Sequence, residues 1–166
     1  MAMTKIKLAL DWTPNVNHIG FFVAQHEGFY REAGIELEWI NPLTDDYTLT
    51  PGRRLAQGLT DFAIAPFETV ISLNNKPNPV NAIAVYAILQ QDLSSIACLK
   101  STGIARPADL DGRHYASYQA RYEDLIVKEI IKNDGGSGDI HITYPPKLGI
   151  WNTLLTGQAD ATWILS

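Results

Sequence analysis

The sequence predicts an α/β fold of two βαβ lobes with mainly parallel sheets. Short apolar runs alternate with segments of helical periodicity along all 166 residues, which is typical of parallel strands joined by helices. The phrase LAQGLTD at residues 55–61 also resembles LLTGQAD at residues 154–160, and each precedes a buried apolar run. In both, a glycine ends a helix and an aspartate that we expect to tie the turn follows. These similar phrases support two lobes, which we place at residues 1–90 and 91–166.

The composition excludes several classes of protein. The formal net charge is −5 with scattered basic residues, so we expect no nucleic-acid partner. Cys98 stands alone in an apolar run and is interpreted as a small buried hydrophobe. No apolar run reaches the ~18 residues of a membrane span, and the first residues do not resemble a signal peptide. We expect a periplasmic or membrane-anchored extracellular location if a signal was removed, and a cytoplasmic one otherwise.

The first lobe begins with a strand, since Ile6, Leu8 and Leu10 alternate with other residues. The motif DWTPN ends that strand, and apolar residues then recur at helical spacing from Ile19. Glycine ends a second helical turn, and Pro51 opens a later helix. The further elements that we predict are a helical turn ending at Gly34, strands at 35–40, 61–65 and 81–88, and helices at 51–57 and from Pro66 onward.

The second lobe is predicted from the same signals. Its expected elements are strands at 93–99, 114–117, 139–144 and 161–165, a helical turn within 104–112, and helices at 123–133 and 146–155. The longest helix is amphipathic, with Leu125, Ile126, Ile130 and Ile131 expected to face inward. Since the last strand has no segment after it, we expect an uncovered edge or face there. A longer polypeptide or a homo-oligomer formed through this strand would cover it.

The loop after the first strand concentrates polar and aromatic side chains. Asp11, Trp12, Asn17 and His18 follow a strand and precede a helix, at the edge where ligands bind in open α/β sheets. Trp12 can equally anchor the loop in the core. Asn17, like Asn15, can simply cap the helix, and His18 can be a hydrogen-bonded residue at the helix start.

Further candidate ligand-binding residues lie at other strand ends and helix starts. Glu68 could accept a hydrogen bond from an exocyclic amine, or it could only favour the helix dipole. A second group follows the strand at 114–117, where Arg121 and main-chain N–H groups suit an anionic or carbonyl substituent and a tyrosine could cover a ring. The alternative is a surface helix start with a solvated arginine and a packed tyrosine. The group comprises Tyr118, Arg121, Tyr122 and Glu123, and the last strand adds Trp163, for which core packing is the alternative.

The sequence predicts no catalytic and no metal site. The histidines at positions 18, 26, 114 and 141 do not have metal-ligand spacing, and no nucleophile elbow is present. The Gly135–Gly138 stretch follows a helix rather than a strand, so it does not predict a phosphate-binding loop.

Three stretches carry a resemblance to a known family. Residues 10–18 (LDWTPNVNH), 24–35 (AQHEGFYREAGI) and 58–66 (GLTDFAIAP) resemble the thiamine-pyrimidine-precursor binding proteins and synthases. The resemblance implies the type II periplasmic-binding-protein fold, in which two α/β lobes close on a small ligand, here about a hinge at residues 90–93. Members of this family are about twice as long, so the chain resembles an amino-terminal portion.

The family includes two functions. Transport members deliver a pyrimidine or a similar small heterocycle to an ABC permease. Synthases of thiamine biosynthesis make the pyrimidine from pyridoxal phosphate and a histidine of their own chain, with a lysine holding the cofactor. The matching stretch here, Ala65–Thr69, has neither side chain. We therefore expect a solute-binding protein that needs no cofactor, with a cytosolic synthase that uses pyridoxal phosphate as the alternative.

Overall fold

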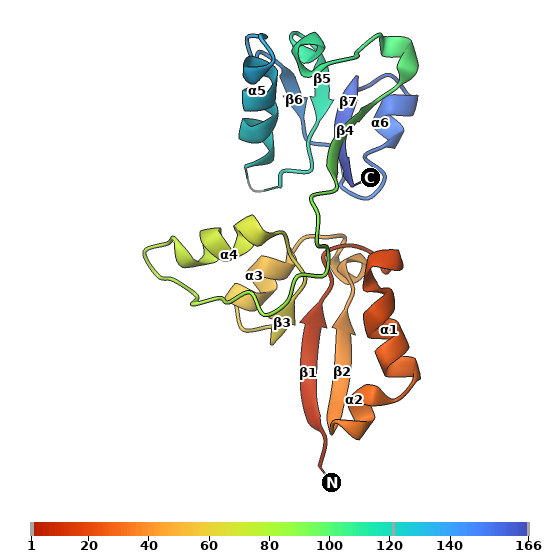
Figure 1. The fold of residues 1–166 in the computed structure, drawn as a ribbon, viewed down its shortest axis with the longest axis vertical. Helices are drawn as coiled ribbons and strands as arrows, with labels where there is room; N and C mark the ends of the chain where they lie inside the picture. Colours follow the sequence, from red (N-terminus) through yellow and green to blue (C-terminus); the bar gives the residue numbers. More distant parts are fainter. Residues whose placement is uncertain (1, 121, 166) are drawn as a thin grey trace. The chain divides into compact units, whose positions relative to one another are not determined.

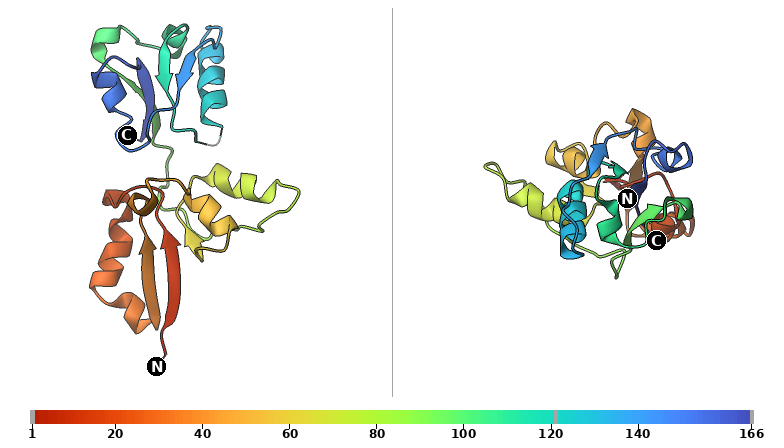
Figure 2. Two further views of the ribbon diagram at one scale, coloured as in Figure 1. Left: turned by 180° about the vertical axis from the view of Figure 1, so that it is seen from behind. Right: turned by 90° about the horizontal axis from the view of Figure 1, so that it is seen from above.

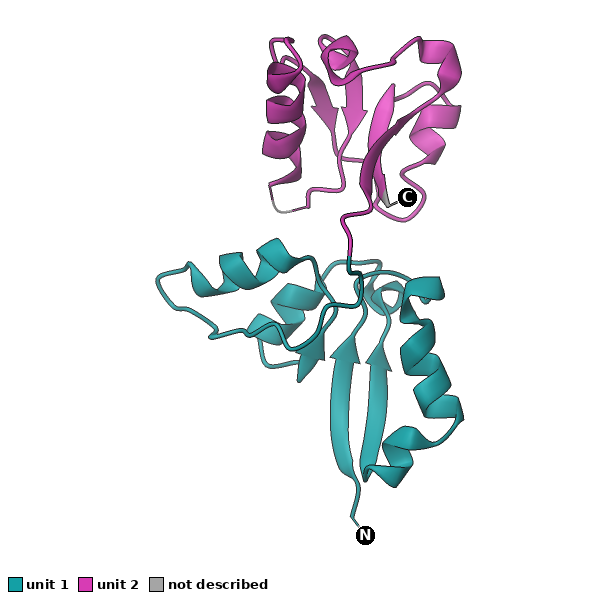
Figure 3. Cartoon of the chain, in the orientation of Figure 1, with its two compact units in different colours: residues 1–90 teal, residues 91–166 magenta. Residues whose placement is uncertain are grey.

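The chain forms two compact units, which Figure 3 distinguishes by colour. The computed structural model describes residues 2–120 and 122–165, and the units comprise residues 1–90 and 91–166. Each unit has its own sheet with helices beside it. No helix among the described residues combines the length and the apolar character that crossing a membrane requires.

Unit 1 contains a three-stranded parallel sheet in the order β2-β1-β3. The central strand β1 (Thr4–Ala9) pairs along all six residues with β2 (Ile35–Ile40). On its other side, only its last two residues pair with β3 (Phe62–Ala63). Because the carboxyl-terminal half of β1 is covered from both sides, Leu8, Ala9 and Leu10 are buried. The loop that follows therefore starts from a fixed point.

The helices of unit 1 lie on two sides of this sheet (Figures 1 and 2). On one side are α1 (Ile19–His26) and α2 (Phe29–Glu32), and on the other are α3 (Pro51–Ala56) and α4 (Phe67–Asn74). Proline at the first position of α3 and the Thr50 side chain as its N-cap explain where that helix starts. The predicted helices at 51–57 and after Pro66 are thus confirmed.

Two predictions for unit 1 are wrong. Residues 81–88 form no strand, although their sequence is rich in β-branched and aromatic residues. The strand predicted at 61–65 is reduced to Phe62–Ala63 and is not buried, since Phe62 is 44% exposed. In both cases the sequence has strand character, but among the described residues β3 has only β1 as a partner and residues 81–88 have none. A strand needs a partner as well as a propensity.

Unit 2 contains a four-stranded sheet in the order β4-β7-β5-β6. These strands span Ser94–Cys98, Ala161–Leu165, His114–Ala116 and His141–Thr143, respectively. The β4–β7 pair is antiparallel, whereas β5 pairs in parallel with both β6 and β7. The expectation of an uncovered edge or face at the last strand is therefore wrong for the edge at Ala161 and Thr162, because these two residues pair with both β4 and β5 within the unit.

The helices of unit 2 are α5 (Glu123–Asn133) and α6 (Asn152–Leu155). The bounds predicted for α5 are confirmed, but its predicted inward face is partly wrong. Leu125 and Ile126 are 64% and 40% exposed, whereas Val127 and Ile131 are fully buried. The buried face comprises residues spaced four apart, beginning at Glu123. The helix predicted at 146–155 is regular only over its last four residues.

The two similar phrases make the same tie in both units. Asp61 accepts a hydrogen bond from the Lys7 N–H at 2.8 Å through its carboxylate and donates its own N–H to the Lys7 carbonyl at 3.0 Å. Asp160 makes the same pair of bonds with His114, at 2.9 and 2.7 Å. Each aspartate thus joins the start of one strand to its parallel neighbour, whereas the sequence predicts a tie within the turn itself.

Candidate functional site

The loop between β1 and α1 is fixed by its own side chains. The Asn15 side-chain oxygen accepts the Asn17 N–H at 2.8 Å, and its amide donates to the Thr13 carbonyl at 2.9 Å. Asn15 is thereby the N-cap of a short 3-10 turn, Val16–His18, that leads into α1. Of the two predicted capping residues, Asn15 caps the turn and Asn17 is half-buried within it.

His18 and Asp11 form a pair in this loop. His18 is 1% exposed, and its Nε2 lies 2.8 Å from Asp11 Oδ1. The Asn15 N–H donates to His18 Nδ1 at 3.3 Å, so Nδ1 is the acceptor and Nε2 has the proton that it donates to Asp11. The pair therefore holds one oxygen of the Asp11 carboxylate in a defined place. The Asp11 side chain remains 33% exposed.

Trp12 lies beside Tyr47, which sequence reasoning did not select. Their ring centroids are 5.3 Å apart at an interplanar angle of 50°. The Tyr47 hydroxyl donates to the main-chain carbonyl of Asp11. Burial, and secondarily the charge of Asp11, raise the pKa of this phenol, so Tyr47 stays protonated as a donor. Trp12 is half-buried at the loop rather than enclosed in the core.

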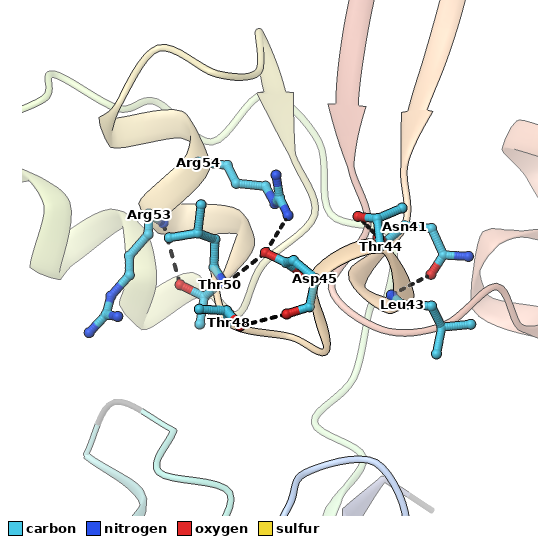
Figure 4. A network of polar contacts seen from close by, with 9 residues as sticks. Asn41, Leu43, Thr44, Asp45, Thr48, Thr50, Arg53 and Arg54 are labelled. Carbon is cyan, nitrogen blue, oxygen red and sulfur yellow. Dashed lines mark hydrogen bonds and ion pairs between the residues drawn. The ribbon is translucent and has the colours of Figure 1, made fainter.

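Tyr47 is held in place by the loop between β2 and α3, shown in Figure 4. Asp45 Oδ2 accepts from Arg54 Nη2 at 2.7 Å and from the Leu49 N–H at 3.1 Å. The Thr48 hydroxyl donates to the Asp45 carbonyl. Tyr47 itself has a positive φ of 60°. This loop reaches the Asp11 segment across 36 positions, and no short-range sequence signal indicates such a contact.

A second loop, between β5 and α5, is organised around Glu123. This side chain is 3% exposed and accepts from the Tyr115 hydroxyl at 2.8 Å. It also accepts the main-chain N–H groups of Tyr118, at 3.3 Å, and Ala120, at 3.1 Å. Burial and the Glu123 charge raise the pKa of Tyr115, which keeps its hydroxyl protonated. Glu123 thus fixes the shape of its own loop.

Asp124 continues this network toward the surface. Its carboxylate accepts from the Ser117 hydroxyl at 2.6 Å and from the Tyr144 hydroxyl at 2.9 Å. Ser117 in turn accepts the Gln119 N–H at 3.0 Å. Gln119 and Tyr122 both have positive φ values, 57° and 74°, so the loop turns sharply twice. The segment Ser117–Ala120 is thus hydrogen-bonded to the first two residues of α5.

The remaining candidate residues lie elsewhere. Glu68 is half-buried in the first turn of α4, where its charge suits the helix dipole. Trp163 packs against the core cluster of unit 2 that includes Leu110 and Tyr115. Tyr122 is 44% exposed at the N-cap of α5. Arg121 lies outside the described residues.

The stretch Ala65–Thr69 lies where the resemblance places the lysine and the histidine of the synthases. Ala65–Thr69 provides no amine and no imidazole, so this stretch does not fit pyridoxal phosphate bound through a lysine. The Thr69 methyl group instead packs close to Gly52 of α3. In the described part of the chain, no group of three or more His, Cys, Asp or Glu side chains could hold a metal ion.

The fold matches that of a solved binding protein. The structure superposes on the alkanesulfonate-binding protein SsuA from Xanthomonas axonopodis pv. citri, bound to MOPS, with a TM-score of 0.67 at 13% identity. That match covers all of this chain and 56% of the other. The chain thus has the α/β fold of periplasmic binding proteins, as the resemblance predicted. The family model described as NMT1/THI5 like matches residues 15–166, and the chain belongs to this family.

Two relatives have names that refer to a pyrimidine. A formylaminopyrimidine-binding protein of Halalkalibacterium halodurans is 25% identical over 162 residues, which is 96% of this chain and 47% of the relative. A 4-amino-5-hydroxymethyl-2-methylpyrimidine phosphate synthase of Legionella pneumophila is 31% identical over 135 residues, which is 78% of this chain and 40% of the relative. The chain spans about half the length of the curated relatives it matches.

Proposed function

We propose that this chain binds a thiamine-related aminopyrimidine, as part of a solute-binding protein of an ABC-type uptake system. Family membership and the binding-protein fold support this function. A binding relative has formylaminopyrimidine in its name. An ABC permease is the partner that this function implies, and a periplasmic or membrane-anchored extracellular location would accompany it.

The single observation on which the proposal rests is the pairing of Asp11 with His18 beside Trp12. His18 donates to one carboxylate oxygen of Asp11, and the Asp11 side chain is still one-third exposed. A carboxylate is the acceptor that an exocyclic amine of an aminopyrimidine requires. The adjacent indole offers an aromatic face for the flat ring. Together they supply the apolar surface and the placed polar group that small-molecule sites combine.

Other candidates have supporting roles in this proposal. Tyr47 fixes Trp12 and the Asp11 main chain, and Glu123 shapes the loop that presents Tyr118 and Tyr122. Asn17, Glu68, Arg121 and Trp163 remain proposed contacts of the ligand. None of these roles requires covalent chemistry.

The second candidate function is a synthase, which the name of the Legionella relative supports. It requires a lysine for pyridoxal phosphate and a histidine that reacts. Ala65–Thr69 supplies neither, and His18 is buried in its pair with Asp11. For this reason we favour binding.

One experiment separates the two functions. Native mass spectrometry of the purified protein, followed by calorimetric titration with formylaminopyrimidine and with 4-amino-5-hydroxymethyl-2-methylpyrimidine, should give saturable binding of an unmodified heterocycle. Incubation with pyridoxal phosphate should give no visible absorbance band of a lysine adduct, and subsequent reduction with borohydride should fix no cofactor to the chain. A cofactor fixed to the chain, together with a decrease in the mass of the chain from a histidine that has reacted, would favour the synthase.

A further inference from the structure

Two histidines lie side by side at one end of the sheet in unit 2. His114 begins β5 and His141 begins β6, and the two residues are partners in the register of these neighbouring parallel strands (Figure 1). Neighbouring strands are about 4.7–4.9 Å apart, and residues in register extend their side chains to the same face. The two imidazole rings accordingly have centroids 5.1 Å apart, at an interplanar angle of 32°.

The main chain holds both histidines in place, whereas their rings are unconstrained by hydrogen bonds. The His114 N–H donates to the Asp160 carboxylate at 2.9 Å, and the His141 N–H donates to the Arg113 carbonyl at 2.9 Å. Both histidines are exposed, and within residues 2–120 and 122–165 neither imidazole makes a hydrogen bond or an ion pair. The rings can therefore turn toward a shared ion without breaking a bond.

The separation of the rings fits two ligands of one metal ion. Two imidazoles bound to a tetrahedral zinc ion through Zn–N bonds of about 2.0–2.1 Å have ring centroids about 5 Å apart. Imidazole suits Zn²⁺, Ni²⁺ and Cu²⁺, whereas Mg²⁺ and Ca²⁺ prefer oxygen ligands. Among the described residues, no third His, Cys, Asp or Glu side chain joins the pair. A bound ion would thus keep positions for water or for an external donor.

We propose that His114 and His141 form a binding site for a divalent transition-metal ion of the class of Zn²⁺ and Ni²⁺. The ion would link β5 to β6, the strand at the edge of the sheet, which pairs only with β5 in the described part of the unit. Sequence spacing does not indicate this site, because the two histidines lie 27 positions apart and meet only when their strands pair.

The metal site is independent of the ligand proposed above. Both histidines lie at the amino-terminal ends of their strands, whereas the loop of Tyr118 and Tyr122 follows the carboxyl-terminal end of β5. Binding of the metal ion can therefore be measured without a pyrimidine, and its failure would leave the proposed function untouched.

Calorimetric titration with zinc chloride tests the site, on the chain without a histidine tag. Imidazole binds metal in its neutral form, so the titration is done at about pH 7.5 in a weakly coordinating buffer. We expect saturable binding of one ion per chain. His114→Gln and His141→Gln should each weaken binding by about tenfold or more, since even the loss of a group that only orients a metal ligand costs about 10- to 100-fold in affinity. His26→Gln, at an exposed histidine of unit 1, is the matched control and should bind as the unsubstituted chain does.

Hydrogen exchange with mass spectrometry gives a second measurement. Zinc should slow exchange at residues 114–116 and 141–143 and leave β1 and β2 unchanged, because the ion stabilises only the strands that it links. Exchange without zinc shows whether each variant keeps the fold of unit 2. A variant that does not keep it is replaced by the corresponding asparagine variant, His114→Asn or His141→Asn.

Three results would overturn the proposal. The first is no saturable binding of zinc. The second is binding that His114→Gln and His141→Gln both leave unchanged, since an adventitious site elsewhere would then hold the ion. The third is equally tight binding of Mg²⁺, because attraction to the net negative charge of the chain would then explain the result.

Discussion

His18 donates its Nε2 proton to Asp11 Oδ1 across 2.8 Å, and the Asn15 N–H bound to Nδ1 specifies that tautomer. One imidazole thus fixes a carboxylate and a main-chain turn at the same time. We expect His18→Phe, which keeps a ring but removes both nitrogens, to lower the free energy of unfolding by about 1–3 kcal/mol, because it leaves polar groups without partners. Urea denaturation measures this, with the exposed His26→Phe as the matched control. Equal stability of the two variants would contradict the assigned role.

Trp12 is expected to provide the aromatic face of the proposed site. Trp12→Ala should weaken binding of formylaminopyrimidine by about tenfold or more, since aromatic contacts with a flat ring contribute about 0.5–1.5 kcal/mol beyond area burial. Calorimetric titration measures the loss. Trp151→Ala, at a tryptophan of unit 2 that is 56% exposed, should bind as the unsubstituted chain does.

Gly52 of α3 approaches Thr69 of α4 too closely for a side chain. A Cβ at Gly52 would lie 2.6 Å from Thr69 Cγ2. Gly52→Ala should therefore destabilise unit 1 by about 1–3 kcal/mol through overpacking. Adding Thr69→Ser, which removes that methyl group, should restore much of the loss. At Gly20 in α1, an added Cβ would have no atom within 4 Å beyond its chain neighbours and the backbone of its own helix. Gly20→Ala should therefore be neutral or stabilise by about 0.5–1 kcal/mol, and thermal denaturation compares the three variants.

Asp61 and Asp160 make equivalent ties between neighbouring strands. Replacing either aspartate by alanine leaves a main-chain N–H without its acceptor, which should lower the free energy of unfolding by about 1–2 kcal/mol. Hydrogen exchange should place the effect of Asp61→Ala at β1 and β3, and that of Asp160→Ala at β5 and β7. Asp139→Ala, which removes an exposed side chain two residues before β6, serves as the control. A change distributed equally over both units would contradict this assignment.

Asp134 gives unit 2 a defined pH dependence. Hydrogen bonds from the Arg106 guanidinium, then from the Ala108 N–H, lower the pKa of this carboxyl from 3.8 to about 2. Because the folded pKa lies below the unfolded one, the stabilisation is present above about pH 4 and is lost as the pH falls toward 2. Arg106→Gln should raise the pKa of Asp134 toward its ordinary value. Carboxyl carbon chemical shifts followed against pH measure both values.

The sequence predicts local structure well wherever the signal is itself local. The bounds of α5 follow from its helical periodicity, and Thr50 and Pro51 indicate the start of α3. The inward face of α5 is not predictable in the same way, because the loop bonds of Glu123 turn that residue inward with Val127. The strand at 81–88 fails for a related reason, since strand propensity cannot report whether a partner is present.

The candidate site shows the same division. Asp11, Trp12 and His18 lie within eight residues after one strand, so the sequence brings them together, and the structure adds how His18 fixes Asp11. Tyr47 could not be selected, because its contact with Asp11 depends on two loops that meet only after β1 and β2 have paired.

The position of β7 between β4 and β5 has a consequence for synthesis of the chain. Ile96 of β4 pairs with Trp163, which lies 67 positions later in the chain. The pairing of β4 and β5 with β7 can therefore form only after β7 has been synthesised. During translation, unit 1 can fold before the sheet of unit 2 is complete, so a nascent chain stalled before residue 161 should keep residues 91–160 sensitive to proteases after the sheet of unit 1 is protected.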